Sequence, residues 1–577
     1  MKTVSGYVEN ITFRNEDNGF TVLTLSSGKE DITCTGNFGY IGQGEYVEIE
    51  GEEVFHEIYG KQIKAINYKI VPATDELSLK KYLGSGAIKG LGAVLADRIV
   101  DKFGEDTFRI IEEEPERLAE IRGITTRKAM DISTQLEEKK DMRDVMIFLQ
   151  GYGISPTLST KIFNNYGTRV YDIIKTNPYQ LADDVTGIGF KTADEIARRA
   201  GVEVNASVRI KSGMCYALTE ASLSGHTYLP KEKMVETTIN LLGLRDQYLN
   251  ADGTYNMELL DNCFTELVLE KKLILKEIDD NQAVFLSTFY YTELNIARML
   301  LELNISTPED DYILGVKMDT VEDMSGIHLD DLQRQAVVAT QNNGVSIITG
   351  GPGTGKTTTI NAIIHLFESD GLEVSLAAPT GRAAKRMTEA TGHEAKTIHR
   401  MLEISGGQSD DPELDAKFGR NEQNPLETDV VIVDEMSMVD TFLMHAFLKA
   451  VTVGTRLVFV GDVNQLASVG PGNVLKDIIE SECFKVVRLT KVFRQAGESG
   501  IVTNAHKINE GKEVKLDNSF GDFLYIEREN AQMALNATIG LIKTKLPAYV
   551  GANEMDIQVL TPMRNGILGV NSLNPGL

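Results

Sequence analysis

Cysteine is scarce in this chain, which has four cysteines among 577 residues. The four are Cys34, Cys215, Cys263 and Cys483. They lie far apart and form no C-x-x-C pair, so neither a disulfide framework nor a zinc or iron–sulfur site is indicated. No stretch of about 18 apolar residues occurs, and the start MKTVSGYVEN lacks the apolar core of a signal peptide. We therefore expect a soluble, cytoplasmic protein with free thiols and no membrane contact.

Positive charge is also in short supply. The chain has 58 Lys and Arg against 84 Asp and Glu, a formal charge of −26, and a uniformly acidic surface would repel nucleic acid. The balance is uneven, however. Residues 80–102 and 380–402 each hold five basic and two acidic residues, and 485–494 holds four basic and none acidic. Residues 403–415 hold five acidic and none basic. Short, focused contacts with nucleic acid therefore stay open as a hypothesis.

The length predicts about three to five domains, and the first of them is residues 1–72. Short alternating segments separated by glycine turns in this region predict a small antiparallel β-barrel of the OB type. Such a barrel either binds a single nucleic-acid strand or serves as a packing module. The residues do not decide between these two alternatives.

Residues 80–200 contain one unit four times, which predicts a repeated structure. The copies are IKGLGAVLADRIV at 88–100, IRGITTRKAMDI at 121–132, LQGYGISPTLSTKIF at 149–163 and VTGIGFKTADEIA at 185–197. In each copy a glycine turn opens a helix, and the exposed N–H groups at a helix start can bind phosphate.

This unit resembles the helix-hairpin-helix motif, which binds the DNA backbone without sequence preference. The full G-x-G form occurs at Gly90 with Gly92 and at Gly187 with Gly189, so the resemblance assigns DNA binding to these four glycines. The copies at Gly123 and Gly153 are degenerate. A purely structural hairpin turn is the alternative for every copy. The sequence of the following segment, 201–325, predicts a helical or winged-helix-like connector and contains no recognisable catalytic or binding motif.

A phosphate-binding loop follows in the stretch GVSIITGGPGTGKTTTINAII at 344–364. A buried strand precedes the octet G-x-x-x-x-G-K-[ST] and a helix follows it, which is the context that this motif requires. The loop glycines let backbone N–H groups wrap the phosphates of ATP, Lys356 reaches the β- and γ-phosphate oxygens, and the Thr357 hydroxyl is a ligand for Mg²⁺. The expected ATP-binding residues of this loop are Gly350, Gly351, Pro352, Gly353, Thr354, Gly355, Lys356, Thr357 and Thr358.

Two further strands end in polar residues. DVVIVDEMSMVD at 429–440 places Asp434 and Glu435 after a buried run, where Asp434 is the expected Mg²⁺ ligand and Glu435 the base that activates water. The next apolar strand ends in GDVNQ, so Gln465 is expected to contact the γ-phosphate.

Several motifs in a fixed order identify a family. GGPGTGKTTT, PTGRAAKRM, TIHRML, VIVDEMSMVD, GDVNQLASVGPGNVL and LTKVFRQ resemble the motifs of the RecD-like helicases of superfamily 1. The barrel and the hairpin repeats resemble the stand-alone RecD/TraA type. The resemblance implies a multidomain fold: β-barrel, helix-hairpin-helix region, an α/β RecA-like P-loop motor domain at 327–484, and a second RecA-like domain.

The resemblance also implies roles for single residues. Gln333 would read adenine, and Arg494, with Lys356, Glu435 and Gln465, would be catalytic. The single-strand track would be lined by Pro379, Thr380, Arg382, Thr397, His399 and Gly472, although His399 could instead be a buried core histidine. Family members carry a strand-splitting pin hairpin in the region 402–428; an exposed acidic loop is the alternative.

The last segment, 485–577, resembles the start of the second RecA-like domain, with 556–561 (DIQVLT) as its first returning strand. Later family motifs do not occur, so we expect a C-terminally truncated chain. The resemblance implies an ATP- and Mg²⁺-dependent 5′-to-3′ DNA helicase, active on single strands and on junctions with duplex, in recombination or repair. It points to a monomer, and no protein partner can be inferred. A DNA-binding ATPase without unwinding activity and an RNA-dependent ATPase are the alternatives.

Overall fold

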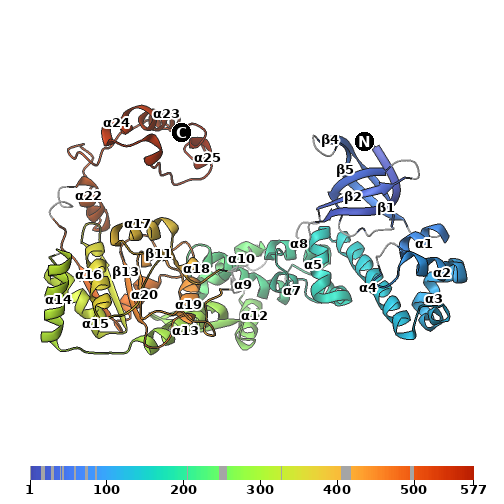
Figure 1. The fold of residues 1–577 in the computed structure, drawn as a ribbon, viewed down its shortest axis with the longest axis horizontal. Coiled ribbons are helices and arrows are strands. Elements are labelled where there is room, and N and C mark those ends of the chain that lie inside the picture. The colour runs from blue at the N-terminus through green and yellow to red at the C-terminus, as the bar shows by residue number, and fades with distance from the viewer. Residues whose placement is uncertain are drawn as a thin grey trace. The chain divides into compact units, whose positions relative to one another are not determined.

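The protein is described by a computed structural model (Figure 1), which divides it into two compact units. The structure describes residues 2–14, 20–27, 31–38, 41, 45–56, 60–71, 76–84, 88–204, 206–245, 257–326, 328–404, 418–493 and 499–577. The first unit contains Met1–Asn295, Ile404–Gly419 and Val469–Gly472, and the second contains Ile296–Glu403, Arg420–Ser468 and Asn473–Leu577. Across the described ranges, no helix has the length and apolarity needed to cross a bilayer.

The first unit begins with a closed five-stranded barrel. Its strands are β1 (Lys2–Arg14), β2 (Phe20–Ser26), β3 (Asp31–Asn37), β4 (Tyr46–His56) and β5 (Gly60–Val71). They neighbour one another in the order β1-β2-β3-β5-β4, and every pair is antiparallel except β3 with β5. Alternate residues face inward, so Val8, Leu23 and Leu25 are buried. The predicted small barrel is confirmed.

Four helices follow the four repeated glycine turns. They are α2 (Ala93–Phe103), α4 (Thr126–Gly151), α5 (Pro156–Tyr166) and α8 (Phe190–Arg199). The glycine two residues before the N-cap of each helix has a positive φ: +86° at Gly90, +105° at Gly123, +79° at Gly153 and +96° at Gly187. A side chain is strained in this region of φ. All four copies therefore share one turn conformation, including the two that are degenerate in sequence.

A three-stranded sheet with helices completes this part of the first unit. The helices are α9 (Ser207–Ser222), α10 (Lys231–Leu242) and α12 (Glu258–Leu269), and the strands are β6 (Tyr228–Pro230), β7 (Leu273–Ile278) and β8 (Asn281–Leu286). The sheet is antiparallel in the order β6-β8-β7. Arg209 Nε of α9 donates to Asp194 Oδ1 of α8 at 2.8 Å, which ties the sheet-bearing region to the last hairpin helix.

The second unit is built on a parallel sheet of six strands in the order β11-β10-β12-β13-β9-β14. The strands are β9 (Val345–Gly350), β10 (Val374–Ala378), β11 (Ala395–Thr397), β12 (Val430–Val433), β13 (Arg456–Gly461) and β14 (Lys485–Leu489). All pairs are parallel. Side chains of α14 (Asp311–Ser325), α15 (Asp331–Asn342) and α16 (Lys356–Ser369) share one buried core with the sheet. The predicted α/β motor fold is confirmed.

Residues 499–577 form helices joined by irregular segments. The elements are α22 (Gly500–Asn509), α23 (Ala531–Gly540), η5 (Leu541–Lys545), α24 (Leu546–Val550), η6 (Glu554–Asp556) and α25 (Val570–Leu573). The strand expected at 556–561 is not formed, and Leu560 is 83% exposed. A strand is stable only when its backbone pairs with a neighbour, and no described residue pairs with this segment in a ladder. The apolar side chains of residues 556–561 are therefore not sufficient to make this segment a strand.

Candidate functional site

The predicted ATP-site residues of the second unit gather at one edge of its sheet. The P-loop follows β9, Asp434 and Glu435 follow β12, and Gln465 lies in the loop after β13. Since all six strands are parallel, their carboxyl ends meet at the same edge, which is where ligands bind in open α/β sheets. The sequence order 350, 434, 465 becomes one spatial cluster because β13 lies between β12 and β9.

The P-loop has the backbone that its glycines predict. Gly353 and Gly355 have φ of +75° and +81°, and α16 begins at Lys356 directly after them. Lys356 Nζ donates to the carbonyl oxygens of Gly350 at 2.7 Å and Gly351 at 3.1 Å. A Cβ at Gly350 would lie 2.6 Å from Thr354 Oγ1. The loop is thus closed around its lysine, and a larger residue at Gly350 would disturb it.

Gln333 supports the loop from the side. Its Nε2 donates to the Gly355 carbonyl at 3.3 Å, and its Oε1 accepts the backbone N–H of Asp330 at 3.0 Å as part of a capping box at the start of α15. On the other flank, the Phe493 N–H donates to the Gly353 carbonyl at 3.2 Å. Both ends of the Gln333 amide are therefore engaged. Each of these bonds uses one of the two N–H groups or one of the two lone pairs of the amide, and the expected contact of Gln333 with adenine stays a prediction.

Asp434 and Glu435 are partly buried in an unfavourable electrostatic setting. Burial raises the pKa of Asp434 and of Glu435, and the neighbouring Asp434 charge raises the pKa of Glu435 further. The charges of Lys356 and Arg386 oppose these effects at both carboxyls. Glu435 also has a φ of +54°, in the left-handed region that a non-glycine residue rarely adopts. Strain and desolvation at one dipeptide are typical of a functional site.

The donor set suits a magnesium nucleotide. P-loop enzymes bind Mg²⁺ through one or two carboxylates and the substrate phosphates rather than an all-protein cage. Among the residues that the structure describes, no group of three or more His, Cys, Asp or Glu is gathered for a metal ion. Asp434 carries the required single, partly buried carboxylate, and the Lys356 ammonium is held by loop carbonyls that phosphate oxygens can replace. The residues present therefore fit ATP with Mg²⁺.

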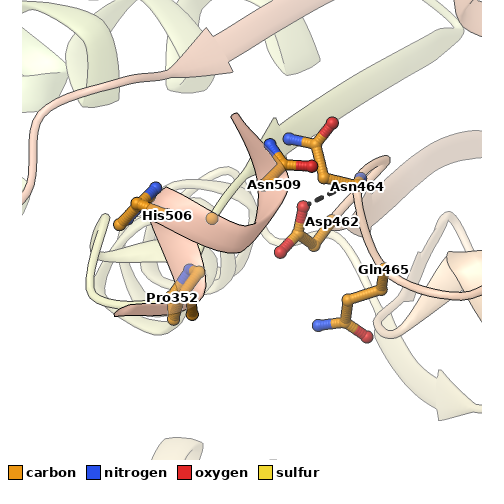
Figure 2. Close-up of a pocket in the computed structure, with 8 residues that line it drawn as sticks. Pro352, Asp462, Asn464, Gln465, His506 and Asn509 are labelled. Carbon is orange, nitrogen blue, oxygen red and sulfur yellow. Dashed lines mark hydrogen bonds between the residues drawn. The ribbon is translucent and has the colours of Figure 1, made fainter. Parts of the chain in front are cut away.

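Gln465 lines a pocket beside the P-loop (Figure 2). This position is compatible with its predicted contact with the γ-phosphate. The pocket has a volume of about 260 Å³. Besides Gln465, it is lined by Gly351, Pro352, Asp462, Asn464, Ala505, His506 and Asn509. Asp462 is 5% exposed, and its Oδ1 accepts the Asn464 N–H at 3.0 Å. The side chains of α22 in this pocket were not predicted from the sequence.

Two predictions fall wholly or partly on residues outside the described ranges. Arg494 is one of them. The pin hairpin is the other, because 405–417 lie outside as well. The flanks of that segment are described: Ile404 and Phe418 form an antiparallel bridge, and the Arg420 N–H donates to the Leu402 carbonyl at 3.1 Å.

Three residues expected along the DNA track, Pro379, Thr380 and Thr397, lie where a strand of the same sheet ends and a helix starts. Pro379 and Thr380 follow β10, and Thr380 Oγ1 accepts the Ala383 N–H at 3.2 Å as the N-cap of α17 (Gly381–Thr391). Thr397 Oγ1 caps α18 (Ile398–Met401) in the same way, accepting the Arg400 N–H at 3.1 Å. These two threonines thus also have a local structural role.

The other three track residues differ in setting. Arg382 Nη1 donates to Gln558 Oε1. His399 is exposed, which removes the alternative of a buried core histidine. Gly472 has a φ of +96°, and its N–H donates to the Gly225 carbonyl at 3.0 Å within the first unit. The track stays a prediction for all six residues.

The four hairpin helices differ at their N-caps. Thr125 Oγ1 accepts the Lys128 N–H at 3.3 Å, and Ser155 Oγ accepts the Leu158 N–H at 3.4 Å. Gly92 and Gly189 occupy the same position at α2 and α8, where no side chain forms a cap. The hydroxyl in each degenerate copy thus occupies an N–H for which the G-x-G copies supply no side-chain acceptor; at α2 this N–H, that of Leu95, instead donates to the Gly92 carbonyl at 2.9 Å.

Three residues of the site were missed by sequence reasoning. Arg386 was seen only as part of a basic segment, Asp462 only as part of GDVNQ, and His506 not at all. The acidic end of a buried strand was a usable signal for Asp462. Nothing local marks His506, which reaches the P-loop only through the fold.

A glycine loop between a parallel strand and a helix, with an acidic pair on a nearby strand end, defines the class of P-loop ATPases. Three family models match the chain: the AAA domain at 328–520, the ATP-dependent RecD2 DNA helicase HHH domain at 138–228, and the OB-fold domain of the ATP-dependent DNA helicase YrrC at 1–72.

Two relatives in sequence agree with these matches. The ATP-dependent RecD2 DNA helicase of Deinococcus radiodurans is 29% identical over 99% of this chain and 77% of its own length. The RecBCD enzyme subunit RecD of Mycolicibacterium smegmatis is 38% identical, over 29% of this chain and 33% of its own. The Pif1 helicase of Candida albicans aligns with a TM-score of 0.28 and 25% identity over 38% of this chain and 56% of its own. The chain is thus similar to RecD-like DNA helicases along nearly its whole length, and by class it is an ATP-hydrolysing DNA helicase.

Proposed function

We propose that this chain uses ATP and Mg²⁺ to move 5′ to 3′ along single-stranded DNA and to unwind junctions with duplex, as a cytoplasmic monomer in recombination or repair. The observation that carries the ATP-dependent step is the cluster of the P-loop lysine with the partly buried pair Asp434 and Glu435 at one sheet edge. Similarity to the RecD-like DNA helicases supports DNA as the track. The direction of movement and the pathway rest on that resemblance.

The roles of the ATP-site residues follow from their chemistry. The loop N–H groups and Lys356 bind the phosphates, and Thr357 with Asp434 holds the metal ion. Bound Mg²⁺ supplies charge neutralisation at the phosphoryl oxygens. Glu435 accepts a proton from the attacking water; its raised pKa makes it a stronger base than an ordinary glutamate. Gln465 and Arg494 contact the terminal phosphate.

Strand displacement on tailed duplexes tests this proposal. A duplex with a 5′ single-stranded tail is expected to be unwound in the presence of MgATP, whereas a blunt duplex and a 3′-tailed duplex are not. The measurement is release of a labelled strand, beside ATP turnover with single-stranded DNA, duplex and RNA added in turn. Preference for the 3′ tail contradicts the direction. Turnover without displacement favours a DNA-binding ATPase, and stimulation by RNA alone favours an RNA-dependent ATPase.

The capping difference predicts that only two of the four hairpins bind phosphate. Gly92→Ser and Gly189→Ser place at α2 and α8 the hydroxyl that Ser155 places at α5. No atom lies within 4 Å of a Cβ at either glycine, and their φ values of −91° and −88° suit any residue. We expect the double variant to keep its melting temperature and to bind duplex DNA roughly threefold to tenfold more weakly, since hydrogen bonds to charged groups are at stake.

Fluorescence anisotropy with duplex DNA at several salt concentrations measures that loss of affinity. The matched control is Gly201→Ser, at a glycine outside the hairpin turns. Its φ is +82°, so a small loss of stability is expected there without loss of affinity. Unchanged binding in the double variant would show that these turns have a structural role alone.

A further inference from the structure

The strongest unassigned feature of the second unit is the pairing of α22 with the P-loop. His506 and Asn509 are three residues apart on α22, so they project from the same face of the helix. Both line the pocket that Gly351 and Gln465 share (Figure 2). Neither residue belongs to any motif that identified the family. The pocket therefore combines predicted γ-phosphate contacts with side chains that have no assigned task.

His506 lies directly against the loop backbone. A Cβ built on Gly351 would lie 2.7 Å from His506 Cε1, too close for any real contact, with Nε2 at 3.5 Å. The imidazole thus packs on Gly351 with no room for a side chain between them. Gly351 is the residue whose carbonyl accepts the Lys356 ammonium at 3.1 Å. That lysine is the group that reaches the terminal phosphates of ATP. The imidazole therefore lies next to the position where these phosphates are expected to bind.

The imidazole also has an unused hydrogen-bonding atom. His506 Nε2 is buried from solvent and has no hydrogen-bond partner within the described parts of the chain. A buried polar atom without a partner loses its hydration without compensation, so native proteins rarely keep one without a reason. A ring nitrogen that carries its proton is a donor, and an anionic phosphoryl oxygen is a strong acceptor for it.

We propose that His506 binds the terminal phosphate of ATP through Nε2–H and thereby distinguishes ATP from ADP. ADP lacks the oxygen that would accept this bond, so the contact exists only before the terminal phosphate leaves. Since His506 is on α22 and the phosphate is held by the P-loop, the bond links the segment after β14 to the nucleotide. This inference rests on the proposed ATP site, and it adds a contact that the helicase motifs do not include.

Equilibrium binding of two nucleotides tests the proposal without depending on turnover. The probes are Mg²⁺ with AMP-PNP, which keeps a terminal phosphate, and Mg²⁺ with ADP, titrated into the full chain by calorimetry. His506→Ala is expected to weaken AMP-PNP binding roughly tenfold, the value of one hydrogen bond to a charged group, while ADP affinity changes less than about twofold. His506→Gln, which restores an N–H donor at a similar reach, is expected to recover most of the lost affinity.

Controls separate this inference from the ATP site itself. His365→Ala removes a half-exposed histidine of α16 that does not line the pocket and should change neither affinity. Equal losses for both nucleotides, or no loss for either, in folded His506→Ala overturn the inference while the ATP site stands. Failure of the unmodified chain to bind either nucleotide overturns the ATP site first. If His506→Ala melts early, the comparison of His506→Gln with the unmodified chain decides, because rescue of AMP-PNP selectivity requires the donor.

Discussion

Replacing Lys356 with alanine is expected to lower DNA-stimulated ATP turnover by about 10²- to 10³-fold, which is the usual cost of removing one preorganised charge donor from a transition state. The fold should survive, because within the described ranges the ammonium donates to two loop carbonyls, those of Gly350 and Gly351. Phosphate release with saturating single-stranded DNA measures the effect, and thermal melting checks the fold.

A surface lysine supplies the control for this variant. Lys476→Ala removes a cation of α20 (Val474–Glu480) that pairs with Glu480, four residues on, at 3.6 Å. Exposed pairs of this kind contribute little, so turnover should stay within about twofold of the unmodified chain. Turnover that persists in Lys356→Ala would contradict the assignment of the P-loop.

Asp434→Asn is expected to reduce turnover by at least about 10²-fold while stabilising the protein without nucleotide. The loss follows from the metal ligand, since a bound cation contributes several kcal/mol to the transition state. The gain follows from the raised pKa of Asp434. A group whose pKa is higher in the folded state stabilises that state below its unfolded pKa, and this contribution is lost as pH rises through the folded value. At neutral pH the ionised Asp434 therefore destabilises the fold, and asparagine relieves that cost.

Thermal melts from pH 4 to pH 8 without nucleotide or metal ion check this prediction. The melting temperature of Asp434→Asn should exceed that of the unmodified chain at pH 7 to 8. The difference should shrink toward pH 4, because the carboxyl of the folded state, with its raised pKa, takes up its proton above the ordinary aspartate value of 3.8. Asp97→Asn, an exposed position in the first unit, controls for the loss of one negative charge. A lower melting temperature for Asp434→Asn at neutral pH would refute the argument.

The loss of turnover and the gain in stability that we expect for Asp434→Asn have the same physical origin. Asp434 follows a fully buried strand, so its carboxyl is desolvated before any metal ion arrives. The strand that brings the ligand to the sheet edge also removes the water that would have stabilised the charge. A bound cation would stabilise this charge in place of water. Without a cation the folded protein is therefore less stable than it would be with a neutral residue at this position.

The acidic total of −26 was a poor guide to the function. Net charge describes the whole molecule, whereas binding depends on local groups. At the sheet edge, Lys356 and Arg386 are close enough to lower the pKa of both partly buried carboxyls. The basic tract 380–402 therefore supplies charge to the ATP site as well as to the expected DNA track.

Local patterns predicted local structure well. The P-loop, the strand that ends at Asp434 and the four hairpin turns each need particular residue types within a few positions, because backbone dihedrals and strand burial are set by near neighbours. The strand at 556–561, which the family resemblance implied, does not form. A strand forms only beside a partner, and pairing is not a local property.

Sequence alone thus determined the class of chemistry: a loop that wraps phosphates, a lysine, and an acidic pair on a strand end. Only the tertiary structure decided which side chains complete the site. Gln333 contacts Gly355, which is 22 positions away in the sequence, and His506 contacts Gly351, which is 155 positions away. Both contacts form only when parallel strands bring their carboxyl ends to one edge of the sheet. Contacts at such separations depend on the packing of whole elements, which no motif encodes.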